Sequence, residues 1–182
     1  MPRHQGVATF QVASIALRRL KTLMPPEPSK SDYIPQANDL DKVLELTRWT
    51  ANEAVTLPQV TDHFRFDARQ AAYYVEAAQE LGLVTGAAEY RATKLGTKVG
   101  QADEHTRLRL FLPAVLALRS IREPIRDLDK APNHVVGIAD LTQSVARVGV
   151  DRYRGETLTR RSECVLSWLR WLENNSEFVT EK

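Results

Sequence analysis

The chain has 182 residues, of which 43% are hydrophobic and 26% are charged, and its formal net charge at pH 7 is +2. This composition is typical of a soluble protein with one large or two small domains, and no apolar run is long enough to cross a bilayer. A single cysteine excludes an internal disulfide framework and a cysteine-rich zinc site. Arg18, Arg19 and Lys21 follow the apolar stretch 12–17 instead of preceding it, which argues against a signal peptide, so we expect a cytoplasmic protein.

Residues 1–37 are expected to form an N-terminal helical arm and a proline-rich linker. Apolar residues recur at helical spacing between Thr9 and Leu23. Four prolines between Pro25 and Pro35 then favour an extended segment that separates the arm from the rest of the chain. The arm is expected to pack on the body or on a partner, because it lacks the segregated basic face of a membrane-surface helix.

Residues 38–100 predict a winged helix-turn-helix domain. Three helices are expected to begin at Asp39, at Thr56 and at Asp67, which forms a capping box with Gln70. Gly82 is expected to end the third helix. A hairpin at 83–92 follows, and the short strand 55–56 is expected to pair with it. The order of short helix, tight turn, longer helix and hairpin is typical of this fold. The overall fold class is therefore expected to be mainly α with small β-hairpin wings, with two winged helix-turn-helix units in tandem.

The longer helix of this domain is the expected recognition helix. Arg69 and Gln70 lie in its first turn, the part that usually enters the major groove. Arginine can pair bidentately with guanine, and glutamine with adenine. Tyr73 on the same face and Arg91 in the hairpin complete the DNA contacts expected of this domain.

The same helix face leaves a second interpretation open. Glu76 and Glu80 would repel phosphates, and residues 39–100 carry seven Lys or Arg against nine Asp or Glu. In this alternative, exposed Tyr73 and Ala77 contact a partner protein, and the acidic face repels DNA.

Residues 101–182 are expected to hold a helical connector and a second, partial winged-helix unit. Pro113 should kink or divide the first helix of the connector, and Pro124 should divide the chain again. The helix-turn-helix pattern then returns, with Thr159 as a candidate cap of the last helix and a strand expected at 178–180. No second wing strand follows, so this unit is incomplete or the chain is a fragment of a longer protein.

The second unit is expected to make most of the phosphate contacts. Five arginines and two acidic residues lie between Arg147 and Arg161. Arg154, Thr159, Arg160 and Arg161 lie near the start of the last helix, where backbone amides and the helix dipole favour an anion. The alternative is that these arginines pair with neighbouring acidic residues and serve solubility only.

Three segments of the first domain, Asp41–Thr50, Phe66–Tyr74 and Leu81–Val84, resemble the winged-helix region of bacterial restriction-enzyme-like and phage-defence proteins. Leu158–Leu172, with its adjacent arginines and two tryptophans, resembles the closing helix of such a region. The resemblance covers roughly residues 39–175. It implies DNA binding, often beside a nuclease or modification domain that this chain lacks.

The sequence contains no recognisable catalytic, cofactor or metal site. It has no nuclease-type acidic pair on an alternating strand, no glycine-rich phosphate loop and no pair of histidines at ligand spacing. Cys164 and Trp168 lie in an apolar helical stretch, where we expect them to pack in the core. We therefore expect a protein without enzymatic activity, cofactor or metal.

The function expected from the sequence is binding of double-stranded DNA, as a transcription regulator or as the target-recognition component of a restriction or phage-defence system. Two alternatives stay open: a protein-interaction module, and an accessory subunit of a separate nuclease. A catalytic or regulatory protein partner and a homodimer are both left open as further partners, and no membrane association is expected.

Overall fold

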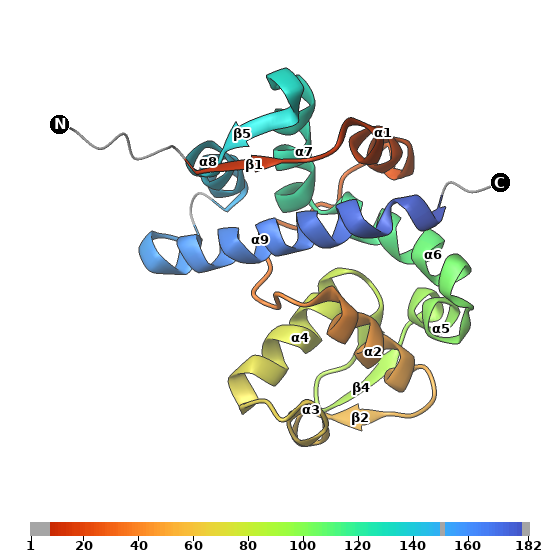
Figure 1. Cartoon of the computed structure of the whole chain (residues 1–182). Helices are drawn as coiled ribbons and strands as arrows, with labels where there is room; N and C mark the ends of the chain where they lie inside the picture. Colours follow the sequence, from red (N-terminus) through yellow and green to blue (C-terminus); the bar gives the residue numbers. More distant parts are fainter. Residues whose placement is uncertain (1–7, 150–151, 180–182) are drawn as a thin grey trace.

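The computed structural model describes residues 8–149 and 152–179, and it shows a mainly helical protein with two small antiparallel sheets (Figure 1). The helices, in chain order, are α1 (Ser14–Leu23), α2 (Leu40–Thr50), α3 (Leu57–Phe64), α4 (Ala68–Glu80), α5 (Lys94–Gln101), α6 (Glu104–Ala117), α7 (Arg119–Lys130), α8 (Ile138–Val148) and α9 (Gly155–Asn175). The strands are β1 (Thr9–Gln11), β2 (Val55–Thr56), β3 (Val84–Thr85), β4 (Glu89–Ala92) and β5 (Val135–Gly137). Two short 3-10 turns, η1 (Pro132–His134) and η2 (Glu177–Val179), complete the described chain. No helix in these described parts combines the length and the apolar character that a bilayer crossing requires.

The first module, which comprises α2 to α5 and β2 to β4, follows the element order expected for residues 38–100. Asp39 accepts hydrogen bonds from the amides of Asp41 and Lys42 at 3.0 and 3.3 Å, and this cap begins α2. Asp67 and Gln70 form the expected capping box at the start of α4, with the Gln70 amide 2.7 Å from Asp67 Oδ1. The α-rich fold and these helix starts are confirmed.

The sheet of the first module has the strand order β2-β4-β3. Val55 lies opposite Tyr90, so the short strand pairs with the hairpin as expected, and Thr85 lies opposite Arg91 within the hairpin. Gly86 has φ +120°, and a Cβ atom there would lie 1.9 Å from the Glu89 carbonyl oxygen, so the tight tip requires glycine. The hairpin is therefore short and closely attached to the helices.

The second module, which comprises β1, α1 and α7 to α9, repeats the order helix, strand, helix, helix through α7, β5, α8 and α9. In the first module β2 pairs with the hairpin strand β4, and in the second β5 pairs antiparallel with β1 from the N-terminus. Phe10 lies opposite Val136 in this pairing. In the second module the partner strand therefore comes from the N-terminal part of the chain.

Residues 9–23 do not form one helical arm. Thr9–Gln11 is a strand and α1 begins only at Ser14. Phe10 and Val12 are buried while Thr9 and Gln11 are exposed, so residues 9–12 show the alternation of a strand, whereas the expected helical period is confirmed within α1. The segment packs against α6 and α9, and it is part of the second module.

The proline-rich segment is also more than a linker. Its residues 31–37, called the strap below, run between the two modules, and Tyr33, Ile34 and Ala37 are buried in the core. Three α9 side chains on one face donate to strap carbonyls: Arg161 to Ile34, Cys164 to Gln36 at 3.4 Å, and Trp168 to Ala37 at 2.6 Å. Figure 1 shows α9 crossing the middle of the molecule, with the first module on one side and the rest of the second module on the other. The strap and α9 therefore hold the two modules together.

The connector differs from expectation at both prolines. Pro113 lies inside α6 and Pro124 lies inside α7, and neither divides its helix. The break falls instead at Leu118, which has extended backbone angles and whose side chain is buried. Tertiary packing at Leu118 outweighs the local effect of either proline.

The last helix begins and ends differently from expectation as well. The helix α9 starts at Gly155, with φ +56°, so Thr159 lies inside the helix and does not cap it. Residues 177–179 form a 3-10 turn where a strand was expected, because the Ser176 amide donates to Glu173 and continues the helical turn. The remaining residue of that expected strand, at position 180, lies outside the described residues.

Candidate nucleic-acid interface

The first turn of α4 presents Arg69 and Gln70 to solvent, as the sequence predicts. Arg69 Nε donates to the Tyr73 hydroxyl, and its guanidinium carbon lies 5.7 Å from the centre of the Tyr73 ring. Gln70 Oε1 accepts a long hydrogen bond of 3.4 Å from the Asp67 amide, which leaves the Gln70 NH₂ group free of this cap. The Arg69 fork and the Gln70 amide are therefore both available to a base edge.

The later turns of α4 are covered by the strap and by α9. Ser31 Oγ donates to Glu80 Oε2 at 2.7 Å. Burial raises the pKa of the Tyr33 hydroxyl, and the neighbouring Glu76 carboxylate raises that pKa further, which places Glu76 beside the strap. Ala77, expected to be exposed, is fully buried, so that expectation was wrong. The cover comes from residues distant in sequence, which the helical period of α4 cannot reveal.

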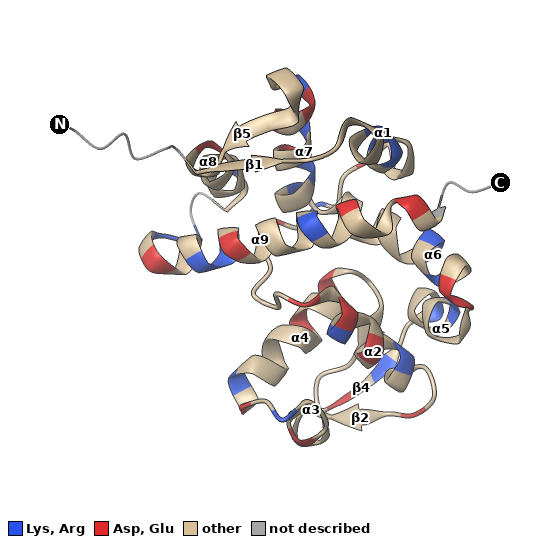
Figure 2. Cartoon of the chain, viewed as in Figure 1, with Lys and Arg blue, Asp and Glu red and all other residues tan. Residues whose placement is uncertain are grey.

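The N-terminal end of α9 lies next to the α4 surface. Arg154, Thr159 and Arg160 are exposed there, and Arg160 Nη2 lies 3.8 Å from Glu156 Oε1 in a loose ion pair. A hollow of about 390 Å³ between α4 and α9 is lined by Tyr73 and Arg160 together with Gln36 and Glu163. Figure 2 shows basic residues at the N-terminal ends of α4 and α9, with acidic residues among them. The structure thus brings Arg69, Tyr73 and Arg160 to one surface.

Arg161 does not belong to this surface, and its assignment as a phosphate contact was wrong. Its side chain is buried, and its guanidinium donates to the Ile34 carbonyl and to Gln36 Oε1, the second at 2.7 Å. The guanidinium carbon also lies 4.0 Å from the centre of the Tyr153 ring. Arg161 points into the junction of the modules because it shares the inward face of α9 with Trp168, whose expected burial is confirmed.

Arg91 lies apart from the other candidates. It is exposed on β4, and its Nη2 atom is 3.5 Å from Glu89 Oε2. Among the described residues, no contact or hollow joins Arg91 to Arg69 or Arg160. The hairpin tip 86–88 contains only glycine and alanine. Arg91 is therefore the only basic residue among residues 84–92, which form the described hairpin.

The family model described as a domain of unknown function, DUF7226, matches residues 42–177. The chain belongs to this family. The DUF7226 match runs from the first turn of α2 into η2, so it includes both α4 and α9 and leaves out β1, α1 and the strap. No match was found among curated proteins or among solved structures. Among the residues that the structure describes, no group of three His, Cys, Asp or Glu side chains is placed to hold a metal ion.

Cys164 lies at the edge of the hollow between α4 and α9 and is half-buried. Burial raises the pKa of its thiol from 9.0 to about 11, although Arg161 nearby acts in the opposite direction. A rise of this size lowers the thiolate fraction at pH 8 about a hundredfold, and only the thiolate is an effective nucleophile. We therefore expect the native protein to react with a disulfide reagent at least about fiftyfold more slowly than the unfolded protein. Equal rates in the presence and absence of denaturant would show that the fold does not suppress the reactivity of the thiol.

Proposed function

We propose that this protein binds double-stranded DNA without catalysing a reaction, with the first module acting as a winged helix-turn-helix and α4 as its recognition helix. In this proposal Arg69 and Gln70 read base edges, and Arg154 and Arg160 at the start of α9 contact phosphates. The second module is proposed to be a related unit in which β1 replaces the missing wing strand.

The element order and the sheet support the choice of α4. A helix, a short strand, two further helices and a hairpin follow one another, and the short strand pairs with the hairpin in the order β2-β4-β3. In helix-turn-helix proteins the second helix of the pair enters the major groove with its N-terminal residues leading. In the first module that helix is α4, and the first turn of α4 is exposed to solvent.

The single observation that carries the proposal is the common surface of Arg69, Tyr73 and Arg160. Arg69 donates to Tyr73, and Tyr73 and Arg160 line the same hollow. A base-reading arginine and a phosphate-contacting arginine must lie on one face of a protein to meet one duplex. Two segments about 90 residues apart in the chain provide this arrangement.

The acidic residues of α4 oppose DNA binding less strongly than the sequence alone indicates. Glu80 accepts a hydrogen bond from Ser31, so its carboxylate is directed towards the strap, and Glu76 is half-buried. The exposed first turn carries Arg69 and Gln70 and is flanked by the exposed Arg65. The surface proposed to face DNA is therefore more basic than the net charge of the module.

Arg69→Ala should reduce the affinity for a selected duplex by roughly 1–3 kcal/mol and relax the preference at one base position, because a bidentate contact to guanine is lost. The measurement is selection of bound sequences from random duplex DNA, followed by fluorescence anisotropy titration of the selected site with both proteins.

The matched control is Arg109→Ala, which removes an exposed arginine from α6, away from this surface. It should leave both the affinity and the selected sequence unchanged. An Arg69→Ala protein with wild-type affinity and wild-type base preference would refute the role of α4.

The biological setting remains the one that the resemblance implies: a cytoplasmic transcription regulator or the target-recognition part of a restriction or phage-defence system. One observation favours an accessory role beside a separate nuclease. Because the later turns of α4 are covered, the exposed first turn offers only a small base-reading surface, and a partner protein or a second copy of the chain would add the remaining contacts. Co-purification from the native host tests this, and recovery of the chain alone and monomeric would contradict it.

A further inference from the structure

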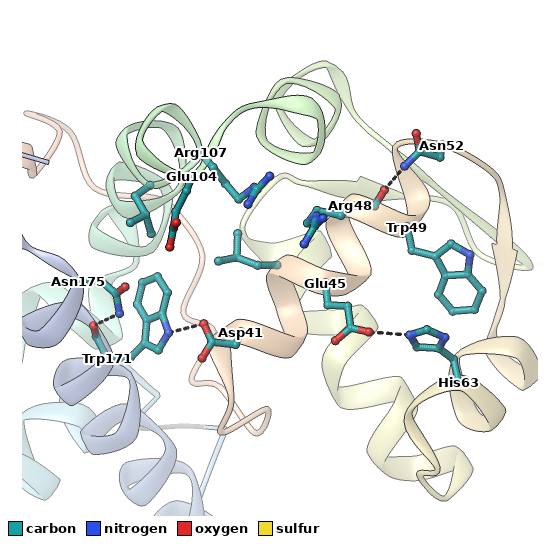
Figure 3. Close-up of a pocket in the computed structure, with 12 residues that line it drawn as sticks. Asp41, Glu45, Arg48, Trp49, Asn52, His63, Glu104, Arg107, Trp171 and Asn175 are labelled. Atoms are coloured by element: carbon teal, nitrogen blue, oxygen red, sulfur yellow. Dashed lines mark hydrogen bonds and ion pairs between the residues drawn. The ribbon is translucent and has the colours of Figure 1, made fainter. Parts of the chain in front are cut away.

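A cavity of about 600 Å³ opens where α2, α3, α6 and α9 meet (Figure 3). It is distinct from the hollow between α4 and α9, and the DNA-binding proposal does not use it. Its volume lies within the range of roughly 300–1,000 Å³ that is typical of small-molecule sites. Both modules contribute to its lining, because α2 and α3 belong to the first and α9 to the second.

Two exposed side chains of opposite charge on its walls have no partner in the described part of the chain. Arg48 on α2 and Glu104 on α6 both line the cavity, and neither side chain forms a hydrogen bond or an ion pair with any residue that the structure describes. The other charged groups are engaged: Glu45 lies 2.7 Å from His63, and Arg107 donates to the carbonyls at the end of α5. The groups left for a ligand are therefore the Arg48 guanidinium, the Glu104 carboxylate and one oxygen of Asp41, whose other oxygen accepts from Trp171.

Leucine side chains and the Trp171 ring also contribute to the lining of the cavity. Leu44 and Leu108 are nearly buried and form part of the lining. The Trp171 ring is half-buried, and Figure 3 shows Glu104 above it and Asp41 beside it. Asp41 Oδ1 accepts from Trp171 Nε1 at 2.9 Å, which leaves Asp41 Oδ2 without this bond. Two carboxylates and an indole ring are groups that attract an ammonium ion.

We propose that this cavity binds a small zwitterionic amino carboxylate. The ammonium group lies between Glu104 and Asp41 beside the Trp171 ring, the carboxylate pairs with Arg48, and the hydrocarbon body covers Leu44 and Leu108. A simple carboxylate would meet three acidic side chains without neutralising any of them, and a simple amine would leave Arg48 unpaired. Only a ligand that carries both charges can pair with Arg48 and with Glu104 at the same time.

The test is a calorimetric titration of the full chain with ω-amino acids of increasing length, from glycine to 8-aminooctanoate, and with the common α-amino acids and dipeptides. Hexylamine and hexanoate are the single-charge controls for 6-aminohexanoate. We expect one chain length to bind best, because the two charged groups are fixed on separate helices. We also expect each single-charge control to bind at least about tenfold more weakly than the zwitterion of equal length.

Arg48→Gln and Glu104→Gln should each weaken binding of the best ligand at least about tenfold, whereas Arg109→Gln and Glu156→Gln, which change exposed residues outside the cavity, should leave it unchanged. Both Gln variants should keep the wild-type unfolding midpoint in chemical denaturation, which separates a lost contact from a damaged fold. No binding by any zwitterion at concentrations up to about 10 mM would overturn the proposal. Single-charge controls that bind as well as the zwitterion would overturn it equally, as would unchanged binding in either Gln variant.

Discussion

Trp168→Ala should lower the free energy of unfolding by roughly 3–5 kcal/mol, the cost typical of removing a fully buried aromatic ring. The Trp168 side chain has no exposed surface and lies at the centre of the junction between the modules. Its Nε1 atom also donates to the Ala37 carbonyl at 2.6 Å, so the substitution leaves a buried strap carbonyl without its partner. Chemical denaturation followed by far-UV circular dichroism measures the change.

Trp168→Phe separates the two contributions, because phenylalanine keeps most of the ring volume but cannot donate the hydrogen bond. It should cost less than half as much as Trp168→Ala. A wild-type unfolding curve for Trp168→Ala would show that the ring does not support the junction, and that α9 and the strap are held by other contacts.

Arg161→Ala should destabilise the protein by roughly 2–4 kcal/mol, although arginine is usually a surface residue. The change removes two charge-assisted donors from the strap, one to the Ile34 carbonyl and one to Gln36 Oε1. It also removes the packing of the guanidinium on the Tyr153 ring. Arg161→Lys should recover only part of the loss, because an ammonium group cannot reproduce the planar fork.

The neighbouring residue provides a matched control. Arg160 is exposed and makes only a loose ion pair of 3.8 Å with Glu156, so Arg160→Ala should change stability by less than about 0.5 kcal/mol. If the two alanine variants unfolded alike, Arg161 would not anchor the strap, and its burial would have no energetic role.

Local signals account for the parts of the fold that the sequence predicts correctly. The Asp67–Gln70 capping box, the Gly82 stop and the glycine at the hairpin tip each act over a few residues, and each stands where it was expected. The exposure of Arg69 follows from the same helical period. These signals define the first module and its helix α4 almost completely.

Non-local contacts account for the parts that the sequence does not predict. The pairing of Phe10 with Val136 joins strands that are more than 120 residues apart in the chain. The local sequence does not reveal this partner strand, so the apolar spacing of the N-terminal segment indicates a helix. The burial of Arg161 depends on the strap, whose prolines indicate only an extended chain. The helical period of α4 does not indicate that Ala77 is buried. The adjacent arginines at 160 and 161 have opposite environments, because Arg161 shares the helical period of the buried Val165 and Trp168 and Arg160 does not.

The salt dependence of duplex DNA binding tests the central claim most directly. Each phosphate contact contributes a slope of about 0.9 to the decrease of log affinity with log salt concentration. The double change Arg154→Ala with Arg160→Ala should therefore weaken binding to all duplexes alike and reduce the slope by about two units. The control Arg109→Ala with Lys130→Ala removes the same charge from exposed positions elsewhere and should leave the slope unchanged. If the wild-type chain bound no duplex at low salt, or if both double variants reduced the slope equally, α4 and the start of α9 would not form a DNA-binding surface.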